Sequence, residues 1–412
     1  MDRNIVIQDT GFTVGNILKS LEENCPEFQE LVKTEVQVID FSSMTVSDNK
    51  GHGSIVRKLT FDLSSGDKFS VALKIPTAAF FIKVAQEQNA DVNAMIEPME
   101  KFISRLHTGE CIFFNNVAGL FETIPIPKVY KVQEWVPGQQ QGCILMEDLG
   151  KRGVVKEKGE ALGKEQVWNV VRSLAEFHVR AWEIEGAWKD KYLDGQNIWA
   201  DISIMYPKII EEVEGLIEEY YEEETVAKLK SYINYFNPVF INREFHIWAY
   251  RDAHVECNVK PVICHGDLWL CNLFWKKESP NELHSFIDWQ LFHEGSPAVD
   301  LARFLILNFR GPLRKEIEET VFDHYIDCIK SELKGKEVPF TVEQLKKCYN
   351  AVFSTQVLAF LSLFRIAITE QTVSKDILME MVEYLFEDSY KLLTGELEAV
   401  KNKFSQVPDI KP

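Results

Sequence analysis

The sequence lacks an excess of basic residues. Its 412 residues contain 45 Lys and Arg against 63 Asp and Glu, so the formal net charge is −18. Proteins that bind nucleic acids meet the phosphate backbone with a basic stripe, and this composition argues against such a partner. A phosphate-bearing ligand would have to find its positive charge locally, from a lysine and a magnesium ion.

Paired cysteines are also missing. The eight cysteines form no C-x-x-C pair. A zinc site built from His254, Cys257, Cys264 and Cys271 is an open alternative, although the spacing fits no usual ligand pattern. Reduced and mostly buried thiols are the simpler interpretation, and they are typical of a cytosolic protein.

Long apolar runs are absent too. The most apolar stretch, Val357–Phe364, is interrupted by Ser362 and followed by Arg365, whereas a membrane-spanning helix needs about 20 apolar residues. The start, Met1–Asn4, leads into short mixed segments and not into the apolar core of a secretory signal. We expect a soluble, cytoplasmic protein with no membrane, nucleic-acid or obligate protein partner. Its length allows two or three domain-sized units.

The most informative stretch is residues 261–290, where a polar loop separates two apolar runs and a third apolar run leads to an aspartate. This pattern is typical of a loop with a fixed tip between buried strands. The polar residues are His265, Gly266, Asp267, Asn272 and Asp288.

These side chains suit phosphoryl transfer. Asp267 can accept a proton from a hydroxyl nucleophile, and Asn272 and Asp288 offer the oxygen ligands that magnesium prefers. Positioning and charge neutralisation do most of the catalysis in such reactions. Taken singly, Asp267 and Asn272 could also be ordinary turn residues after Gly266.

The motif H-G-D-x4-N, followed by Asp288, resembles the active-site motifs of the aminoglycoside phosphotransferase and choline kinase superfamily. With Trp269 it reads H-G-D-x-W-x-x-N, which is similar to the CHK kinase-like (ecdysteroid-kinase-like) branch and to its nematode members. The resemblance extends from about Gly11 to Leu393.

The resemblance implies an α+β, two-lobed protein-kinase-like fold. An N-terminal ATP-binding lobe, residues 1–148, would hold an antiparallel sheet with a helix. A larger, mainly helical lobe, residues 149–412, would hold the catalytic loop and the substrate site. The local pattern predicts a helix over 12–24, strands over 35–40, 55–63, 69–75 and 128–135, an insertion or flexible loop over 77–100, and one or two helices over 99–120.

Lys74 closes the third predicted strand in the sequence V-A-L-K. It resembles the kinase lysine that grips the α- and β-phosphates of ATP, although a surface lysine on an edge strand remains an alternative. One strand earlier, Gly51, Gly53 and Ser54 lie in a turn whose backbone N–H groups could cover the phosphates. The same glycines could equally form a plain hairpin turn.

A helical glutamate should hold this lysine in place. Glu110 fits the H-x-x-E pattern of the resembled family and opens an apolar helical run, while Glu97 and Glu100 are alternatives. At the end of the next buried strand, Cys143–Gly150, the resemblance places backbone contacts to adenine at Met146, Glu147 and Leu149. A plain buried strand would read the same way.

In the second lobe the spacing predicts a helix over 166–183 in which His178 is a hydrogen-bonded core residue, and an acidic, solvated helix over 209–229. Asp300 is predicted to begin a helix and to cap its free N–H groups. The resemblance adds that Asp300 braces the catalytic loop, and His265 is expected to hold the backbone shape of that loop.

Three features favour a small-molecule substrate over a protein substrate. Gly266 stands where protein kinases have the arginine of H-R-D, only eleven residues separate Asp288 from Asp300, and Trp289-Gln290 replaces Phe-Gly. The sequence therefore predicts a kinase that uses ATP and Mg²⁺ and takes a small hydroxylated molecule, with Asp267 as the base. A binding protein without turnover and an atypical protein kinase remain alternatives.

Overall fold

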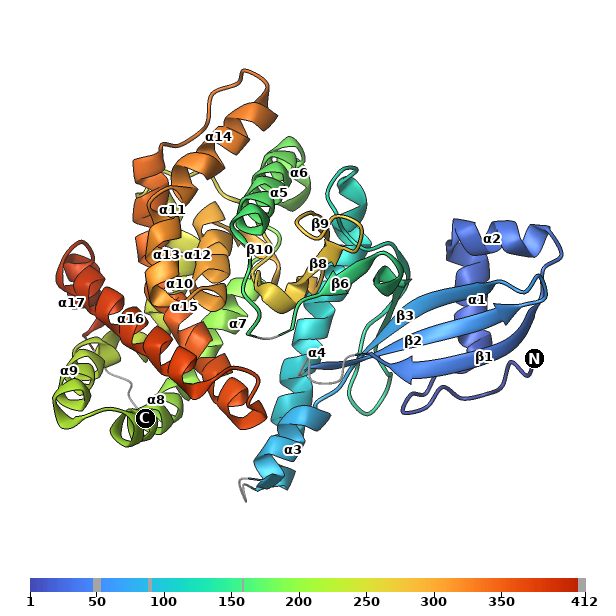
Figure 1. The fold of residues 1–412 in the computed structure, drawn as a ribbon, viewed down its shortest axis with the longest axis horizontal. Coiled ribbons are helices and arrows are strands. Elements are labelled where there is room, and N and C mark those ends of the chain that lie inside the picture. The colour runs from blue at the N-terminus through green and yellow to red at the C-terminus, as the bar shows by residue number, and fades with distance from the viewer. Residues whose placement is uncertain (47–52, 88–90, 158, 407–412) are drawn as a thin grey trace. The chain divides into compact units, whose positions relative to one another are not determined.

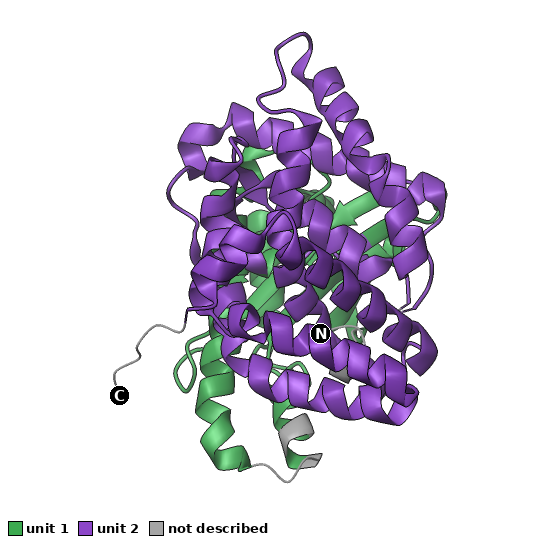
Figure 2. Ribbon diagram, turned by 90° about the vertical axis from the view of Figure 1, so that its left-hand side faces the viewer, with its two compact units in different colours: residues 1–155, 274–280, 284–290 green, residues 156–273, 281–283, 291–412 purple. Residues whose placement is uncertain are grey.

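The computed structural model describes residues 1–46, 53–87, 91–157 and 159–406. The chain forms two compact units, which Figure 2 shows in two colours. Unit 1 holds residues 1–155, 274–280 and 284–290, and unit 2 holds the remaining residues of the chain. Asp288 therefore belongs to unit 1, while Asp267 and Asn272 belong to unit 2.

Unit 1 is built on a five-stranded sheet with the strand order β1-β2-β3-β5-β4, of which Figure 1 labels β1, β2 and β3. All of its pairings are antiparallel. The strands are β1 Val38–Thr45, β2 Ser54–Leu63, β3 Lys68–Pro76, β4 Val129–Gln133 and β5 Cys143–Glu147. Strand β3 lies between β2 and β5, so both of its edges are hydrogen-bonded, and Lys74 pairs in register with Val56 and Ile144.

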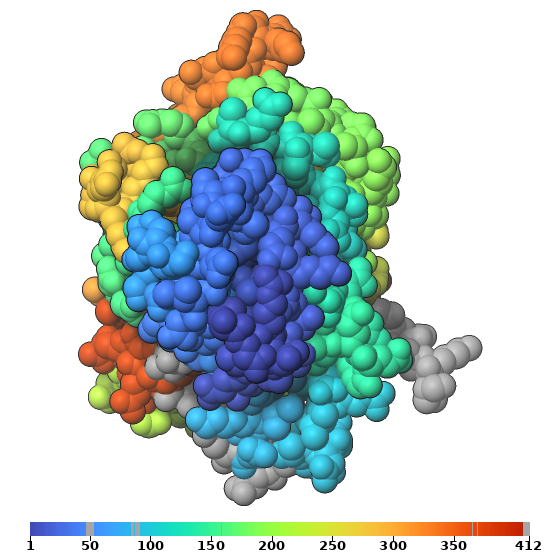
Figure 3. Space-filling model, turned by 90° about the vertical axis from the view of Figure 1, so that its right-hand side faces the viewer, coloured from blue at the N-terminus to red at the C-terminus, as the bar shows by residue number. Residues whose placement is uncertain are grey.

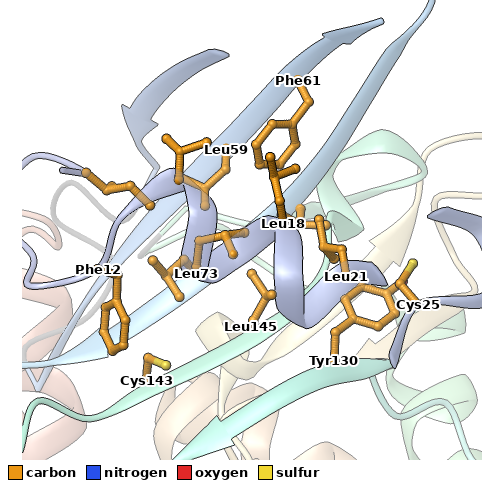
Figure 4. Packing of buried hydrophobic residues seen from close by; sticks show 14 of the residues in the cluster. Phe12, Leu18, Leu21, Cys25, Leu59, Phe61, Leu73, Tyr130, Cys143 and Leu145 are labelled. Atoms are coloured by element: carbon orange, nitrogen blue, oxygen red, sulfur yellow. The ribbon is translucent and has the colours of Figure 1, made fainter. Parts of the chain in front are cut away.

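One face of this sheet packs against helix α1, Val14–Asn24, and α2, Pro26–Lys33, follows it. Thr13 caps α1, because its side-chain oxygen accepts a hydrogen bond from the backbone N–H of Asn16, and Oδ1 of Asn16 accepts one from the backbone N–H of Thr13. In Figure 4, leucines of α1 lie against apolar side chains of β2, β3 and β5. The labelled residues include Leu18, Leu21, Leu59, Phe61, Leu73 and Leu145. The N-terminal residues, in dark blue, lie on the face of the molecule shown in Figure 3.

This packing decides where Lys74 points. Side chains alternate along a strand, and Leu73 and Ile75 belong to the core cluster beneath α1. Lys74 consequently lies on the opposite face of the sheet, where it is buried as well.

The predicted loop over 77–100 is wrong. That region forms α3, Ala79–Glu87, and the first turns of α4, Val92–Asn116. Asp91 caps α4 by accepting a hydrogen bond from the backbone of Ala94, so the polar break in the sequence separates two helices. The first strand is also displaced from its predicted position, 35–40, to Val38–Thr45.

Two small sheets accompany the main one. β6, Gly153–Val155, β8, Leu273–Lys276, and β9, Leu283–Phe286, form a three-stranded sheet in the order β6-β8-β9. In unit 2, β7, Val262–Cys264, pairs antiparallel with β10, His293–Gly295. The polar loop after β7 thus begins at a buried strand, as predicted.

Unit 2 is otherwise helical. Its helices are α5 Lys164–Glu183, α6 Glu185–Trp188, α7 Asp194–Ile202, α8 Tyr206–Tyr220, α9 Glu223–Phe240, α10 Arg243–Ile247, α11 Ala253–Glu256, α12 Pro297–Asn308, α13 Gly311–Glu318, α14 Val321–Leu333, α15 Val342–Glu370, α16 Lys375–Thr394 and α17 Glu398–Phe404. The acidic helix predicted over 209–229 is two helices, α8 and α9. Glu223 and Glu224 lie in the first turn of α9, where the helix dipole favours negative charge.

Helix α15 packs against α12. Its segment Val342–Ile368 is long and apolar enough to cross a membrane, because it contains an 18-residue window with a mean hydropathy of 1.8. However, 71% of that apolar window is buried within the fold, as in the central helix of a folded core. Length and composition alone do not distinguish the two situations.

The core beneath α1 can be tested with Leu145→Ala. Leu145 is fully buried in the cluster, so its truncation should lower the free energy of unfolding by about 2–5 kcal/mol, measured by urea denaturation. Ile39→Ala is the matched control, because Ile39 is 56% exposed and its truncation should cost less than about 0.5 kcal/mol. Equal losses in the two variants would contradict this account of the core.

Candidate active site

Lys74 is the centre of a charged cluster in unit 1. Its Nζ lies 2.6 Å from Oε2 of Glu110 and 2.6 Å from Oδ1 of Asp288. Burial alone would lower the pKa of Lys74, but the charges of Asp288 and Glu110 and the hydrogen bonds to both outweigh it and raise that pKa. Burial also raises the pKa of Glu110, and the charge of Lys74 opposes this rise. The lysine therefore stays cationic in a buried setting.

The structure selects Glu110 among the three candidate glutamates. Glu110 is buried on α4, whereas Glu97 is exposed and Glu100 half-buried, both nearer the start of that helix. The pairing predicted for Lys74 is thus formed by the residue that the H-x-x-E pattern favours.

Helix α4 also fixes the segment that carries Asp288. A Cβ atom at Gly109 would lie 2.5 Å from the carbonyl oxygen of Gln290, so glycine allows the helix to approach this backbone. One turn later, the ring of Phe113 stacks on Trp289 with the centroids 4.1 Å apart. Asp288 itself has a φ of +67°, a backbone conformation that is uncommon outside glycine and is often found at functional sites.

The predicted phosphate loop is described in part, because Gly51 lies outside the described residues. The carbonyl of Gly53 accepts a hydrogen bond of 3.0 Å from the backbone of Thr77, and Ser54 begins β2 opposite Pro76. These contacts place both residues beside the end of β3 that carries Lys74. Their role toward a nucleotide remains a prediction.

The predicted adenine contacts lie at the end of β5. Met146 pairs with Ala72 on one side and Val129 on the other, and the N–H of Glu147 donates to the carbonyl of Lys128 at 2.9 Å. That donor is therefore engaged inside the sheet. Leu149 is buried in a short 3-10 helix, Leu149–Lys151. The assignment of adenine to these three residues remains a prediction.

A second cluster, in unit 2, is organised by Asp300. Its Oδ2 accepts the backbone N–H of His265 at 2.8 Å, and its Oδ1 accepts that of Gly266 at 2.9 Å. The predicted capping role is wrong, because Ser296 caps α12 by accepting from the backbone of Ala298. Asp300 sits in the first turn of that helix and binds the loop instead.

His178 forms a hydrogen bond with the carboxylate of Asp300. Its Nε2 lies 3.3 Å from Oδ2 of Asp300, and its Nδ1 lies 2.6 Å from the hydroxyl of Tyr325, so the prediction of a hydrogen-bonded core histidine is confirmed. Burial alone would raise the pKa of Asp300. The hydrogen bond and charge of His178, with the backbone of Gly266, outweigh burial and lower that pKa.

Gly266 has a φ of +81°. A Cβ atom there would also overlap the carbonyl oxygen of Leu291. Glycine is therefore required twice at this position, once for the backbone conformation and once for the space.

Asp267 and Asn272 lie together, as predicted. The side-chain nitrogen of Asn272 lies 2.8 Å from the carbonyl oxygen of Asp267 and 3.3 Å from its Oδ2. Because this nitrogen faces Asp267, the amide oxygen of Asn272 is the atom that can ligate a metal. His265 shapes the loop, since its Nδ1 accepts the backbone N–H of Asp267 at 3.2 Å.

Two residues at this loop were missed from the sequence, Arg303 and Trp199. The Nε of Arg303 lies 3.8 Å from Oδ1 of Asp267, and the indole N–H of Trp199 donates to the carbonyl of Gly266 at 3.1 Å. Arg303 did leave a signal, as the one charge within the apolar run Leu301–Leu307. Trp199 left none.

The antiparallel sheet with its buried lysine–glutamate pair and the helical unit with its braced H-G-D loop together define a kinase-like fold. A family model described as "Uncharacterized oxidoreductase dhs-27" matches residues 25–402, and the chain belongs to this family.

Two relatives come from Caenorhabditis elegans. One, "Uncharacterized oxidoreductase dhs-27", is 25% identical over 84% of this chain, which spans only 41% of that relative. The other, "Uncharacterized kinase-like protein D1044.1", is 23% identical over 69% of this chain and 70% of its own length. The name of this second relative agrees with a kinase-like chain, and membership of the aminoglycoside phosphotransferase and choline kinase superfamily stays a prediction.

Solved structures with similarity to the chain include two phosphotransferases. Choline kinase from Cryptosporidium parvum is 13% identical with a TM-score of 0.44, over 94% of this chain and 96% of its own. ADP-bound aminoglycoside phosphotransferase APH(2'')-Ib is 12% identical with a TM-score of 0.37, over 89% of this chain and 99% of its own.

Asp300→Asn tests the brace. The variant keeps the size of the side chain but removes its charge and one acceptor, so the free energy of unfolding should fall by about 2–3 kcal/mol at pH 7. Because the folded-state pKa of Asp300 is lowered, its contribution is present above the unfolded pKa of about 3.9 and is lost as the pH falls further.

The gap between wild type and Asp300→Asn should therefore persist from pH 7 to pH 5 and close below about pH 4. Denaturation curves at these pH values measure it. Asp323→Asn, an exposed position on α14, is the control and should cost less than about 0.5 kcal/mol. A gap that closes between pH 7 and pH 5 would contradict the assignment.

Proposed function

We propose that this protein is an ATP-dependent phosphotransferase that moves the γ-phosphoryl group to a hydroxyl group of a small molecule. The observation that carries the proposal is the buried cluster in unit 1, where Lys74 lies 2.6 Å from both Glu110 and Asp288. A strand lysine held by a helix glutamate is the arrangement with which kinases grip ATP phosphates.

The other predicted site residues take the following roles in this proposal. Asp267 accepts the proton of the substrate hydroxyl, and His265 and Asp300 hold the loop in shape. Lys74 meets the α- and β-phosphates. Gly51, Gly53 and Ser54 are assigned to the phosphates as well, and Met146, Glu147 and Leu149 to adenine.

Asn272 and Asp288 fit a magnesium site by the chemistry of their donors. An amide oxygen and a carboxylate are hard ligands of the kind magnesium takes, and magnesium fills its other positions with water and phosphate oxygens. When bound, the ion would supply positive charge to the β- and γ-phosphates. The protein would hold the two ligand side chains in place. The position of Asp288 is fixed by its neighbour Trp289, whose ring stacks on Phe113 of α4.

The name of one relative suggests a different class, oxidoreductases. Dinucleotide-binding domains are built on parallel βαβ units, but the main sheet of unit 1 is antiparallel throughout. The matched region takes only 41% of that relative. This fold therefore favours phosphoryl transfer for the region shared with the chain.

Asp267→Asn tests the proposed base. Turnover should fall by at least about 100-fold, because the substrate hydroxyl loses its proton acceptor. The measurement is magnesium-dependent ATP consumption with a panel of sterols, choline-like amines, sugars and glycosylated xenobiotics. Binding of MgADP, measured by calorimetry, should stay within about twofold, since the base makes no contact with the nucleotide in this proposal. Full activity in this variant would remove Asp267 from its role.

Lys74→Met tests the phosphate grip in the same assay. Loss of the cation should lower kcat/KM for MgATP by at least about 100-fold. Lys68→Met is a matched control on the same strand, at an exposed position, and should leave kcat/KM unchanged. A Lys74→Met enzyme with wild-type kcat/KM would argue for a purely structural lysine.

A further inference from the structure

Arg303 is an unusual arginine. Its side chain is fully buried on α12, yet none of its three guanidinium nitrogens has a hydrogen-bond partner among the residues that the structure describes. Its nearest acidic group is Asp267, with 3.8 Å between Nε and Oδ1, which is too far for a hydrogen bond. A buried charge without hydrogen bonds costs several kcal/mol, so Arg303 is expected to lower the stability of the folded protein.

Arg314 shows what a structural arginine looks like in the same unit. It is also buried, on α13, but its guanidinium binds Glu318 at 2.6 Å and also Asp388. Both carboxylates are within hydrogen-bond distance. The two arginines share burial, but of the two only Arg314 donates hydrogen bonds to carboxylates among the described residues.

The position of Arg303 is set by helix α12 and by the ring of Trp199. Residues three apart lie on the same face of a helix, so α12 presents Asp300 to the loop backbone and Arg303 to the side chain of Asp267. The central carbon of the guanidinium lies 3.7 Å from the centre of the Trp199 ring, and the same indole donates to the carbonyl of Gly266. Trp199 thus fixes the loop and the cation together.

We propose that Arg303 is the positioning residue of Asp267, an inference that rests on the proposed function. A cation at 3.8 Å orients the carboxylate by its charge. A bidentate hydrogen bond would instead occupy the lone pairs that must receive the substrate proton, and it would weaken the base. The missing hydrogen bonds of Arg303 are therefore the useful feature, and stacking on Trp199 holds the guanidinium in place without them.

Arg303→Met, Arg303→Lys and Arg314→Met form the kinetic test. Arg303→Met should lower kcat by about 10- to 100-fold with KM for MgATP within about twofold, while its Tm equals or exceeds that of wild type because a buried charge without hydrogen bonds is gone. Arg303→Lys keeps the charge but not the planar group that stacks on Trp199, so it should recover only part of that loss. Arg314→Met should lower Tm by about 6 °C or more and leave kcat of the folded enzyme unchanged.

A second arm needs no turnover. Asp267→Asn should lower Tm because Arg303 loses its nearest anion, and adding Arg303→Met should restore most of the loss, whereas independent residues would give additive changes. Wild-type kcat in Arg303→Met, or additive changes in Tm, would overturn the proposal. If wild type consumes no ATP with any acceptor, the proposed function fails by itself, and the Tm cycle still decides whether Arg303 and Asp267 are coupled.

Discussion

The two hydrogen bonds from the backbone of His265 and Gly266 to the carboxylate of Asp300 hold the H-G-D loop in its shape. They bring two successive N–H groups onto one buried side chain, which requires the sharp backbone that only glycine permits at residue 266. Asp267 follows directly after this turn, and the side chain of Asn272 folds back to donate a hydrogen bond to the carbonyl oxygen of Asp267. A carboxylate at the start of α12 therefore decides the geometry of a loop more than thirty residues earlier.

Both clusters obey the same electrostatic rule. A buried charge is costly unless an opposite charge or hydrogen bonds compensate it. Lys74 is compensated by two carboxylates, and Asp300 by two backbone donors and His178. Arg303 is the least compensated of the three charges, because it has one carboxylate at 3.8 Å and no hydrogen bond among the described residues.

Much of this could be predicted from the sequence, because the signals were local. V-A-L-K and H-x-x-E identified Lys74 and Glu110, and the apolar stripe around His178 predicted a core histidine. The helical residues between 79 and 98 were missed because Asn89, Asp91 and Pro98 interrupt the periodicity, whereas the later part of α4 lies within the helical region predicted over 99–120. The partners of Asp300 and Arg303 lie far away in the chain. Spacing alone cannot tell a helix cap from a long-range brace.

Gly109 has a consequence for how unit 1 can move. Because Gly109 has no side chain, the backbone of Gln290 lies directly against α4. Gly109 is next to Glu110 in the sequence, and Gln290 is two residues after Asp288, so this contact lies close to both carboxylates that bind Lys74. Phe113 and Trp289 stack across the same contact. A tilt of α4 would therefore displace both carboxylates that bind the ammonium group of Lys74.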